Sequence, residues 1–366
     1  MKILLMGFAK MKYMPYMHFY LNHIDTVEHD VHLLYWNRDG VTETQLDSVH
    51  CHEFIYVMDD DIPKLQKIRG FFEYRKYAQT LLKREKFDFI IIMHSLPGVL
   101  MSGYLTRNYH GKYIFDYRDF TYENFVPYKR VIHKLALAAH SVFISSEGFR
   151  TVLPSECNIK ISHNIVPDAM QRRKNFEYRA DKPLRVAFWG YIRHEQLNRT
   201  IIAKLSNDER FELHFYGREQ DIALSLKKYA VESGAKNVVF HGAYDPGEQD
   251  VFAEETDMIH NIYSNTEAPS QVFAVTNKFY DGLVYRLPQI CMSGSFMGQL
   301  VSDECLGIVC DPQAPSFNDE LWDYYHSFDS NEFCKSCDRV LEKVLREYEE
   351  GRSVIIDAIT STQKTE

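Results

Sequence analysis

Residues 277–282 combine residue types that can bind a phosphorylated nucleoside. Asn277 and Lys278 stand where a helix is expected to begin, and the unpaired N–H groups and dipole of a helix N-terminus favour an anion such as a diphosphate. Lys278 adds a positive charge at that end. Asp281 follows one turn later, and a carboxylate there can accept hydrogen bonds from the two neighbouring hydroxyls of a ribose. The pattern predicts a site for a nucleoside diphosphate.

A second helix N-terminus is expected shortly afterwards. The apolar run Gln289–Met292 predicts a strand, and it is followed by Ser293, Gly294, Ser295 and Phe296. Small residues let the backbone approach a ligand closely, and they can open another helix. Two helix N-termini at one sheet edge, with a carboxylate between them, are typical of a site for a nucleotide diphosphate.

Two residues of the first half could act on a substrate hydroxyl. His94 directly follows the apolar run Phe89–Met93, so it should emerge at the carboxyl end of a strand. A histidine there could orient a hydroxyl or take its proton, or it could serve as an ordinary hydrogen-bonding residue. Asp119 is the alternative base, and its structural alternative is an ion pair with Arg118 or a helix cap.

Short apolar runs alternate with amphipathic helical patterns along the whole chain, which indicates α/β layers with parallel sheets. The predicted strands are Lys2–Phe8, Val31–Trp36, Glu53–Val57, Phe89–Met93, Tyr113–Asp116, Val142–Ser145, Leu184–Trp189, Glu212–Tyr216, Val238–Phe240, Met258–Ile262, Gln289–Met292 and Gly307–Cys310. The predicted helices include Pro15–His23, Lys64–Lys86, Val126–Ala139 and a last helix over Asn331–Glu350, with a frayed tail after Ile359.

The pattern predicts two domains rather than one, as the length of 366 residues also suggests. Residues 1–170 form the first Rossmann-like domain, and the polar stretch 171–183 forms a linker. Residues 184–330 form the second Rossmann-like domain, and 331–366 a C-terminal helix and tail. Two facing α/β domains with parallel sheets create a cleft, and ligands are expected at the carboxyl ends of the strands.

The chain resembles the family-4-type GT-B glycosyltransferases, especially bacterial capsule and O-antigen enzymes. The resemblance is carried by Asn277–Gly282 with the following Arg286–Ile290, by the strand and turn Arg185–Arg193, and by Val239–Gly242. The segments Val142–Glu147 and His163–Asp168 extend it over most of the chain in the same order. The resemblance implies a GT-B fold, with an acceptor on the first domain and a nucleotide-sugar donor on the second.

The resemblance also implies roles for individual residues. Gly190 belongs to the turn that places Arg193 against the donor diphosphate, and Asp281 would hold the nucleoside ribose. The stretch Ser293–Phe296 would lie along the diphosphate and sugar, and Lys278 would be a second cation. The sequence departs from the family pattern at Phe273, where a glutamate is usual, and it lacks the usual lysine after the Gly-x-x-Arg turn.

The implied activity is transfer of a sugar from a nucleoside-diphosphate sugar to a saccharide or lipid-linked saccharide during surface polysaccharide synthesis. The resemblance favours retention of configuration, and it implies neither a metal nor another cofactor. Two alternatives stay open: a catalytically silent GT-B subunit that binds a partner transferase, and a nucleotide-sugar 2-epimerase.

Composition limits the remaining classes of function. The net charge of −9 argues against a nucleic-acid partner, which needs a basic surface. Seven cysteines without regular spacing indicate reduced thiols in the cytoplasm. Cys334 and Cys337 form an isolated C-x-x-C that lacks two further zinc ligands. Asp59–Asp60–Asp61 matches a metal-binding D-x-D, but a helix cap explains it more simply.

One segment suggests contact with a membrane surface. Residues 64–86 carry eight Lys or Arg and two Glu, with four aromatic residues between them. Such a helix suits an anionic bilayer, where a lipid-linked acceptor would lie, and would make the protein peripheral on the inner membrane face. Alternatively, it is a surface helix whose aromatic side chains face the sheet and whose charges face water.

Overall fold

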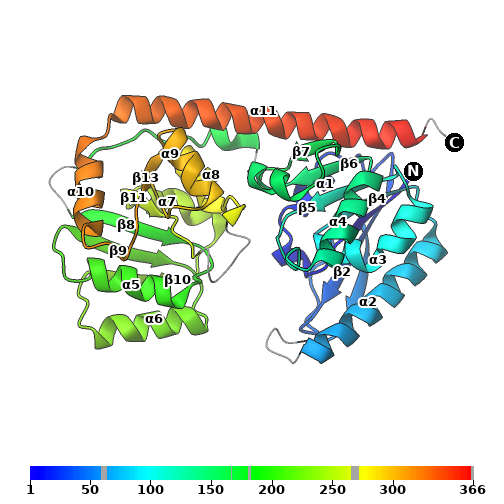
Figure 1. Cartoon of the computed structure of the whole chain (residues 1–366), viewed down its shortest axis with the longest axis horizontal. Helices are drawn as coiled ribbons and strands as arrows, with labels where there is room; N and C mark the ends of the chain where they lie inside the picture. The colour runs from blue at the N-terminus through cyan, green and yellow to red at the C-terminus, as the bar shows by residue number, and fades with distance from the viewer. Residues whose placement is uncertain (59–63, 166, 180–182, 265–271, 364–366) are drawn as a thin grey trace. The chain divides into compact units, whose positions relative to one another are not determined.

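The computed structural model describes residues 1–58, 64–165, 167–179, 183–264 and 272–363. The chain divides into two compact units. Unit 1 comprises Met1–Asn164 and Arg346–Glu366, and unit 2 comprises Ile165–Leu345. Each unit is built on one parallel sheet flanked by helices (Figure 1).

Unit 1 contains a sheet whose seven described strands are all parallel, in the order β3-β2-β1-β4-β5-β6-β7. The strands are β1 (Lys2–Met6), β2 (Asp30–Asn37), β3 (His50–Ile55), β4 (Phe89–Met93), β5 (Tyr113–Tyr117), β6 (Ser141–Ile144) and β7 (Ile159–Ile161). All five residues of β4 are buried, as expected for a central parallel strand covered on both faces. The order reverses between β1 and β4, so this sheet has its topological switch point there.

The helical elements of unit 1 are η1 (Met11–Tyr13), α1 (Met17–Leu21), α2 (Lys64–Glu85), α3 (Ser95–Asn108), α4 (Val126–Ala138) and η2 (Glu147–Val152). Helices α2, α3 and α4 pack side by side in chain order. Tyr74 of α2 is fully buried, and its hydroxyl donates to the carbonyl oxygen of Gly7 at 2.5 Å. This bond ties α2 to the turn that follows β1.

Unit 2 repeats the arrangement with six described strands in the order β10-β9-β8-β11-β12-β13, again all parallel. The strands are β8 (Leu184–Trp189), β9 (Phe211–Tyr216), β10 (Val238–Gly242), β11 (Met258–His260), β12 (Gln289–Cys291) and β13 (Gly307–Val309). The switch point of this sheet lies between β8 and β11.

Alternate residues of β8 enter two different apolar cores. Val186 and Phe188 pack with α5 (Glu195–Leu205), α6 (Asp221–Glu232) and α10 (Phe317–Ser327). Ala187 and Trp189 pack on the other face, where the elements are η3 (Pro167–Met170), α7 (Gln249–Ala253), α8 (Asn277–Val284), α9 (Phe296–Asp303) and the first part of α11 (Ser330–Gln363). The short η4 (Pro246–Glu248) contacts α7. The sheet is therefore covered on both faces, which explains why its strands are apolar runs.

The predicted α/β class with two parallel sheets is confirmed. Every predicted strand is present with its ends within three residues of the expected ones, and β7 is an additional short edge strand that was not predicted. The polar residues 171–179 carry neither helix nor strand, and they lie along unit 2, where the Lys174 amide donates to the carbonyl of Val284 at 3.1 Å.

The last helix, α11, is longer than predicted. It continues past Glu350 to Gln363. Gly351 does not end it. A Cβ at this glycine would lie 3.0 Å from the Phe19 ring and 3.1 Å from that of Phe143, so the glycine allows close packing on unit 1. Beyond it, Ile355 and Ile359 are buried and keep the helix folded. Among the residues that the structure describes, no helix combines the length and the low charge that a bilayer span requires.

Candidate functional site

The turns after β8 and β9 are locked together at the carboxyl edge of the unit 2 sheet. The Gly190 amide donates to the carbonyl of Tyr216 at 2.8 Å, and the Gly217 amide donates to the carbonyl of Gly242 at 2.8 Å. A Cβ at Gly217 would lie 2.1 Å from the carbonyl oxygen of Gly190, so only glycine fits. Gly190 itself has a φ of +109°, which L side chains rarely adopt.

This packing brings two arginines to one aromatic ring. Tyr191 is 45% exposed. The guanidinium carbon of Arg193 lies 5.1 Å from the centroid of its ring, and that of Arg218 also lies 5.1 Å from it. Both arginines are exposed. Arg193 is the predicted diphosphate ligand, and the structure places it at the exposed sheet edge.

Helix α8 begins at Asn277, as predicted, and a buried polar network holds its first turn. The hydroxyl of Thr276 donates to Asn261 at 2.7 Å, and Asn261 donates to Gln289 at 3.0 Å. Gln289 in turn donates to the carbonyl of Phe279 at 3.1 Å. Because the Thr276 hydroxyl is used in this network, it does not cap the helix. Asn277 is exposed at the helix start.

Lys278 takes a different position from its exposed neighbour. Its side chain is buried, and its ammonium donates to the carbonyl of Trp189 at 3.2 Å and to the hydroxyl of Tyr263. The nitrogen also lies 4.2 Å from the centroid of the Phe188 ring. These contacts engage the charge within the fold and attach α8 to the end of β8.

Asp281 is half-buried on α8, and burial raises the pKa of its carboxyl to about 7, while the positive charges of Lys278 and Arg172 lower it. Among the described residues, none donates a hydrogen bond to this carboxylate. A carboxylate whose pKa is raised, and whose oxygens accept no hydrogen bond from the described residues, is typical of a ligand site. Tyr244 lies close enough for the charge of Asp281 to raise the pKa of its hydroxyl, after the larger effect of burial.

The turn before α9 is built as the sequence predicts. Ser293 and Gly294 are exposed, and Gly294 has a φ of +79°. Ser295 caps α9, because its hydroxyl oxygen accepts from the Gly298 amide at 3.0 Å. Phe296 is the first residue of the helix and is half-buried. The Ser295 hydroxyl is thus engaged in the cap, and the exposed backbone at residues 293–294 is what this turn offers a ligand.

In unit 1 the two predicted hydroxyl-binding residues lie in direct contact. His94 follows β4, next to the switch point of the sheet, and its Nε2 lies 3.2 Å from Oδ2 of Asp119. Its Nδ1 accepts from the Leu96 amide at 3.1 Å. Since Nδ1 is an acceptor, the neutral ring carries its proton on Nε2 and donates it to Asp119. The side chain of Asp119 is 58% exposed and that of His94 is 18% exposed, so the carboxylate is the more accessible partner.

The backbone at His94 is strained. Its φ is +125° and ψ is 152°, a combination that is almost restricted to glycine and costs about 1–3 kcal/mol. Two contacts hold the residue in this state: the cap on α3, and the nearly parallel ring of Phe8 with a centroid separation of 6.5 Å. Strain held in place by surrounding contacts is typical of functional positions.

The alternative partner for Asp119 is not used. Arg118 instead donates to Asp116 at 2.8 Å and to Ser162 at 2.6 Å. Burial raises the pKa of Asp116, and the charge of Arg118 opposes that shift. The buried pair Asp116–Arg118 is therefore structural, and it leaves Asp119 next to His94.

Neither the cysteines nor the acidic residues form a metal site in the described part of the chain. No group of three or more His, Cys, Asp or Glu side chains there could hold an ion, and all seven cysteines are free thiols. Asp59–Asp60–Asp61 lies outside the described residues.

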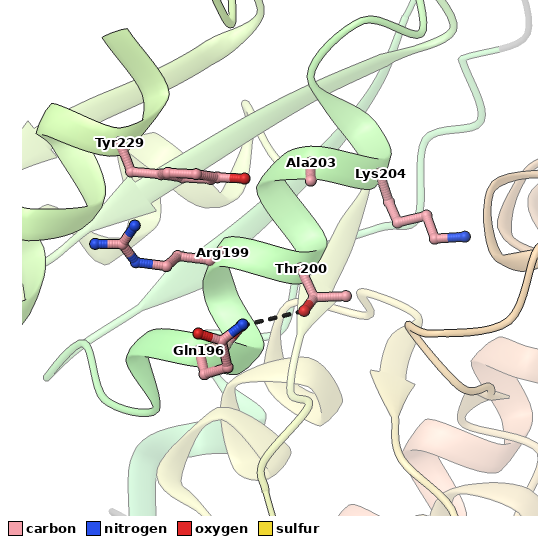
Figure 2. A pocket seen from close by; sticks show the side chains of 6 residues that line it. All are labelled: Gln196, Arg199, Thr200, Ala203, Lys204 and Tyr229. Carbon is pink, nitrogen blue, oxygen red and sulfur yellow. Dashed lines mark hydrogen bonds between the residues drawn. The ribbon is translucent and has the colours of Figure 1, made fainter. Parts of the chain in front are cut away.

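A surface pocket of about 450 Å³ lies on α5 and α6, and Figure 2 shows its lining, which includes none of the residues above. Its cations are held by neighbouring groups. Arg199 donates to Glu195 at 2.8 Å and to Ser225 at 2.9 Å, and Lys204 donates to the carbonyl of Ala314 at 2.8 Å. The charges of Arg199 and Lys204 are therefore engaged by groups of the protein. The carboxyl edge of the unit 2 sheet is the better candidate for a ligand site.

Comparison with solved structures identifies the architecture. The chain is similar to an apo form of the lipopolysaccharide outer core galactosyltransferase WaaB, with a TM-score of 0.66, 14% identity and 99% of each chain covered. It is similar to WaaG, a glycosyltransferase involved in lipopolysaccharide biosynthesis, with a TM-score of 0.60 and 11% identity, covering 97% of this chain and 99% of that one. It is also similar to Anabaena HepE in complex with UDP and glucose, with a TM-score of 0.55 and 12% identity, covering 100% and 98%.

These similarities show that the chain has the GT-B fold. A scan against protein-family models found no match, and a search of curated proteins found none either.

Sequence reasoning missed Arg218. The signal was present, because Gly217–Arg218 follows the predicted strand Glu212–Tyr216 as Gly190–Arg193 follows the strand before it. Only the packing of the two turns shows that both arginines contact Tyr191.

We expect Asp281 to make stability depend on pH. An aspartate has a pKa near 3.9 in an unfolded chain, so between about pH 4 and pH 7 the folded protein holds a proton that the unfolded chain has lost. The stabilisation that the protonated Asp281 carboxyl contributes to the folded state is fully present below about pH 4 and is lost as the pH rises through about 7. Asp281→Asn cannot ionise, so its unfolding free energy should rise relative to that of the wild type across this range.

Urea unfolding of both proteins at several pH values, followed by circular dichroism, measures this difference. Asp323→Asn, which removes an exposed carboxylate on α10, is the matched control and should show no such trend. A constant difference between Asp281→Asn and the wild type from pH 4 to pH 7 would contradict the assignment.

Proposed function

We propose that this protein is a glycosyltransferase that uses a nucleoside-diphosphate sugar. The observation that carries the proposal is the sheet edge of unit 2, where an exposed Arg193, the start of α8 and the half-buried Asp281 belong to one region. The GT-B fold supports it, since the compared structures include two transferases of lipopolysaccharide biosynthesis and a complex with UDP and glucose.

The donor would bind with its diphosphate against Arg193 and the backbone amides at the N-termini of α8 and α9. Asp281 would accept hydrogen bonds from the ribose hydroxyls, and the exposed turn at Ser293–Gly294 would lie along the diphosphate and sugar. When the bond to the sugar breaks, negative charge develops on the departing diphosphate. Fixed cations and helix N-termini stabilise that charge, so we propose a reaction that needs no metal. Retention of configuration at the sugar follows from the family resemblance.

The acceptor would be a saccharide or lipid-linked saccharide whose hydroxyl meets Asp119 in unit 1. The geometry favours Asp119 over His94 as the group that receives the hydroxyl proton, because the His94 ring donates to Asp119 and accepts from Leu96. His94 would then be a positioning residue. Its bond holds the carboxylate in one orientation, which a general base requires.

A nucleotide-binding screen tests the donor site. UDP, GDP, CDP and dTDP are added in turn to the wild type, Arg193→Ala and Asp281→Ala, and thermal unfolding is recorded. A nucleotide at 100 times its dissociation constant should stabilise the wild type by about 2.7 kcal/mol, and both variants should lose most of that shift. Arg339→Ala, an exposed arginine of unit 2 on α11, is the control and should keep it.

The other outcomes separate the alternatives. If no nucleotide shifts the wild type, the donor site is wrong, and a silent GT-B subunit explains the fold better. A protein that binds a nucleotide and isomerises the nucleotide sugar without any acceptor is an epimerase rather than a transferase.

The second test concerns the His94–Asp119 pair. With the nucleotide sugar identified by the screen and a panel of saccharide and lipid-linked acceptors, Asp119→Asn should lower kcat by about 10²- to 10⁴-fold, because it removes a proton acceptor. Donor binding should not change. His94→Asn keeps an acceptor for the Leu96 amide but is too short to reach Asp119, so it should lower kcat while leaving the melting temperature nearly unchanged. Wild-type kcat in Asp119→Asn would exclude this carboxylate as the base.

We also propose that α2 rests on an anionic membrane, which would place the protein in the cytoplasm on the inner face of the membrane. The aromatic residues of this helix differ in exposure: Tyr74 is fully buried, whereas Phe72 is 61% exposed. Exposed Ile68 and the exposed cations Arg75 and Lys76 lie on the same helix. Exposed apolar side chains among cations suit the headgroup region of a bilayer.

Vesicle sedimentation tests this surface. Vesicles that contain phosphatidylglycerol should bind the wild type, and pure phosphatidylcholine vesicles should bind it much less. Each cation near the surface contributes about 1 kcal/mol, so Arg75→Gln with Lys76→Gln should reduce partitioning by more than about tenfold. Phe72→Ser should weaken it further, and Lys227→Gln with Lys228→Gln on α6 should not. Equal binding of all these proteins would contradict the proposal.

A further inference from the structure

We propose that Arg218 is a second ligand of the donor diphosphate, and that the Tyr191 ring, which both guanidinium groups contact, positions Arg193 and Arg218 for it. This inference rests on the proposed nucleotide-sugar site and adds a residue and a geometry to it.

The need for a second cation follows from the chemistry. A nucleoside diphosphate leaves with at least two negative charges, and one guanidinium does not balance them. The sequence suggests Lys278 as the partner of Arg193, but the Lys278 ammonium is buried between the carbonyl of Trp189, the hydroxyl of Tyr263 and the ring of Phe188. Moving it to the exposed edge would break these contacts and leave the buried groups without a partner.

Arg218 can supply the second cation at the exposed sheet edge, which the buried Lys278 cannot. It is exposed, and it stands on the turn after β9, directly next to the turn that carries Arg193. Its guanidinium carbon is 5.1 Å from the centroid of the Tyr191 ring, the same distance as that of Arg193. A guanidinium can bind phosphate oxygens with two parallel hydrogen bonds.

The two turns are held in fixed register. The Gln220 side-chain amide donates to the carbonyl of Ile192, which links the residues following each turn. The close approach of Gly217 to the Gly190 carbonyl fixes the turns at their bases. Because both arginines rest on one ring between these two ties, they present their charges without first having to be ordered.

The nearby carboxylates have other partners. Glu195, two residues after Arg193, accepts from Ser225 at 2.6 Å and from Arg199 at 2.8 Å. Glu219, next to Arg218, pairs with Lys227 at 2.8 Å. These two adjacent acids are therefore engaged by other residues of unit 2.

Calorimetric titration of Arg218→Ala tests the assignment, with the nucleoside diphosphate that binds the wild type and the matching monophosphate as probes. Loss of a charge-assisted hydrogen bond to phosphate should raise the dissociation constant of the diphosphate by roughly 10- to 100-fold. The monophosphate should be affected much less. The diphosphate affinity of Arg218→Lys should lie between that of the wild type and that of Arg218→Ala, because lysine keeps the charge but loses the paired hydrogen bonds.

Two further variants separate a direct contact from a general loss of charge or fold. Arg339→Ala removes an exposed arginine elsewhere in unit 2 and should bind both probes as the wild type does. For the contact with the Tyr191 ring, Tyr191→Phe keeps the ring and should keep diphosphate affinity, whereas Tyr191→Ala should lose affinity as the arginine variants do.

The outcomes distinguish this inference from the function on which it rests. If Arg193→Ala weakens diphosphate binding and Arg218→Ala does not, the inference is overturned and the proposed function stands. Equal weakening of monophosphate and diphosphate by Arg218→Ala also overturns it, because the arginine would then contact the nucleoside. If the wild type binds none of UDP, GDP, CDP and dTDP, both the function and the inference fail.

Discussion

A Cβ at Gly217 would lie 2.1 Å from the carbonyl oxygen of Gly190, and this close approach of two turns organises the edge of the second sheet. The parallel pairing of β8 and β9 places their carboxyl ends together, and the missing side chain at Gly217 lets the turns beyond them touch. Tyr191, Arg193 and Arg218 depend on this contact for their positions. A larger residue at Gly217 would push the turns apart and separate the two guanidinium groups.

The end of β11 and the first turn of α8 are held by hydrogen bonds between buried polar groups. His260 at the end of β11 contacts Asn198 at 3.0 Å, and burial lowers the pKa of its ring to about 3. It is therefore neutral at physiological pH, and so it does not repel the nearby Lys278 ammonium. The Thr276–Asn261–Gln289 network fixes the first turn of α8. Because an unpaired buried polar group is costly, these bonds define one orientation of α8 and hence one position for Asp281.

In unit 1 the candidate residue His94 has a strained backbone. His94 keeps a backbone conformation that suits glycine, and the cap on α3 and the contact with the Phe8 ring hold it there. In each unit one candidate residue follows a strand that borders the switch point of a parallel sheet: His94 follows β4, and Arg193 follows β8. The fold supplies that position twice, and the local residues give the two edges different chemistry: cations in unit 2, and a histidine–carboxylate pair in unit 1.

The order of strands and helices was determined by the sequence itself, because buried parallel strands are short apolar runs and helices carry a longer apolar period. The positions of Arg193 and Asp281 could also be predicted, since each stands at a recognisable turn or helix start. Three features depended on tertiary contacts between segments distant in the chain. The ammonium of Lys278 is engaged by Trp189 and Tyr263, and Arg218 shares a ring with Arg193. The helix α11 continues through Gly351 because Phe19 and Phe143 pack against that glycine. A local pattern gives the type of a side chain and its element, but which groups surround it follows only from how the elements pack.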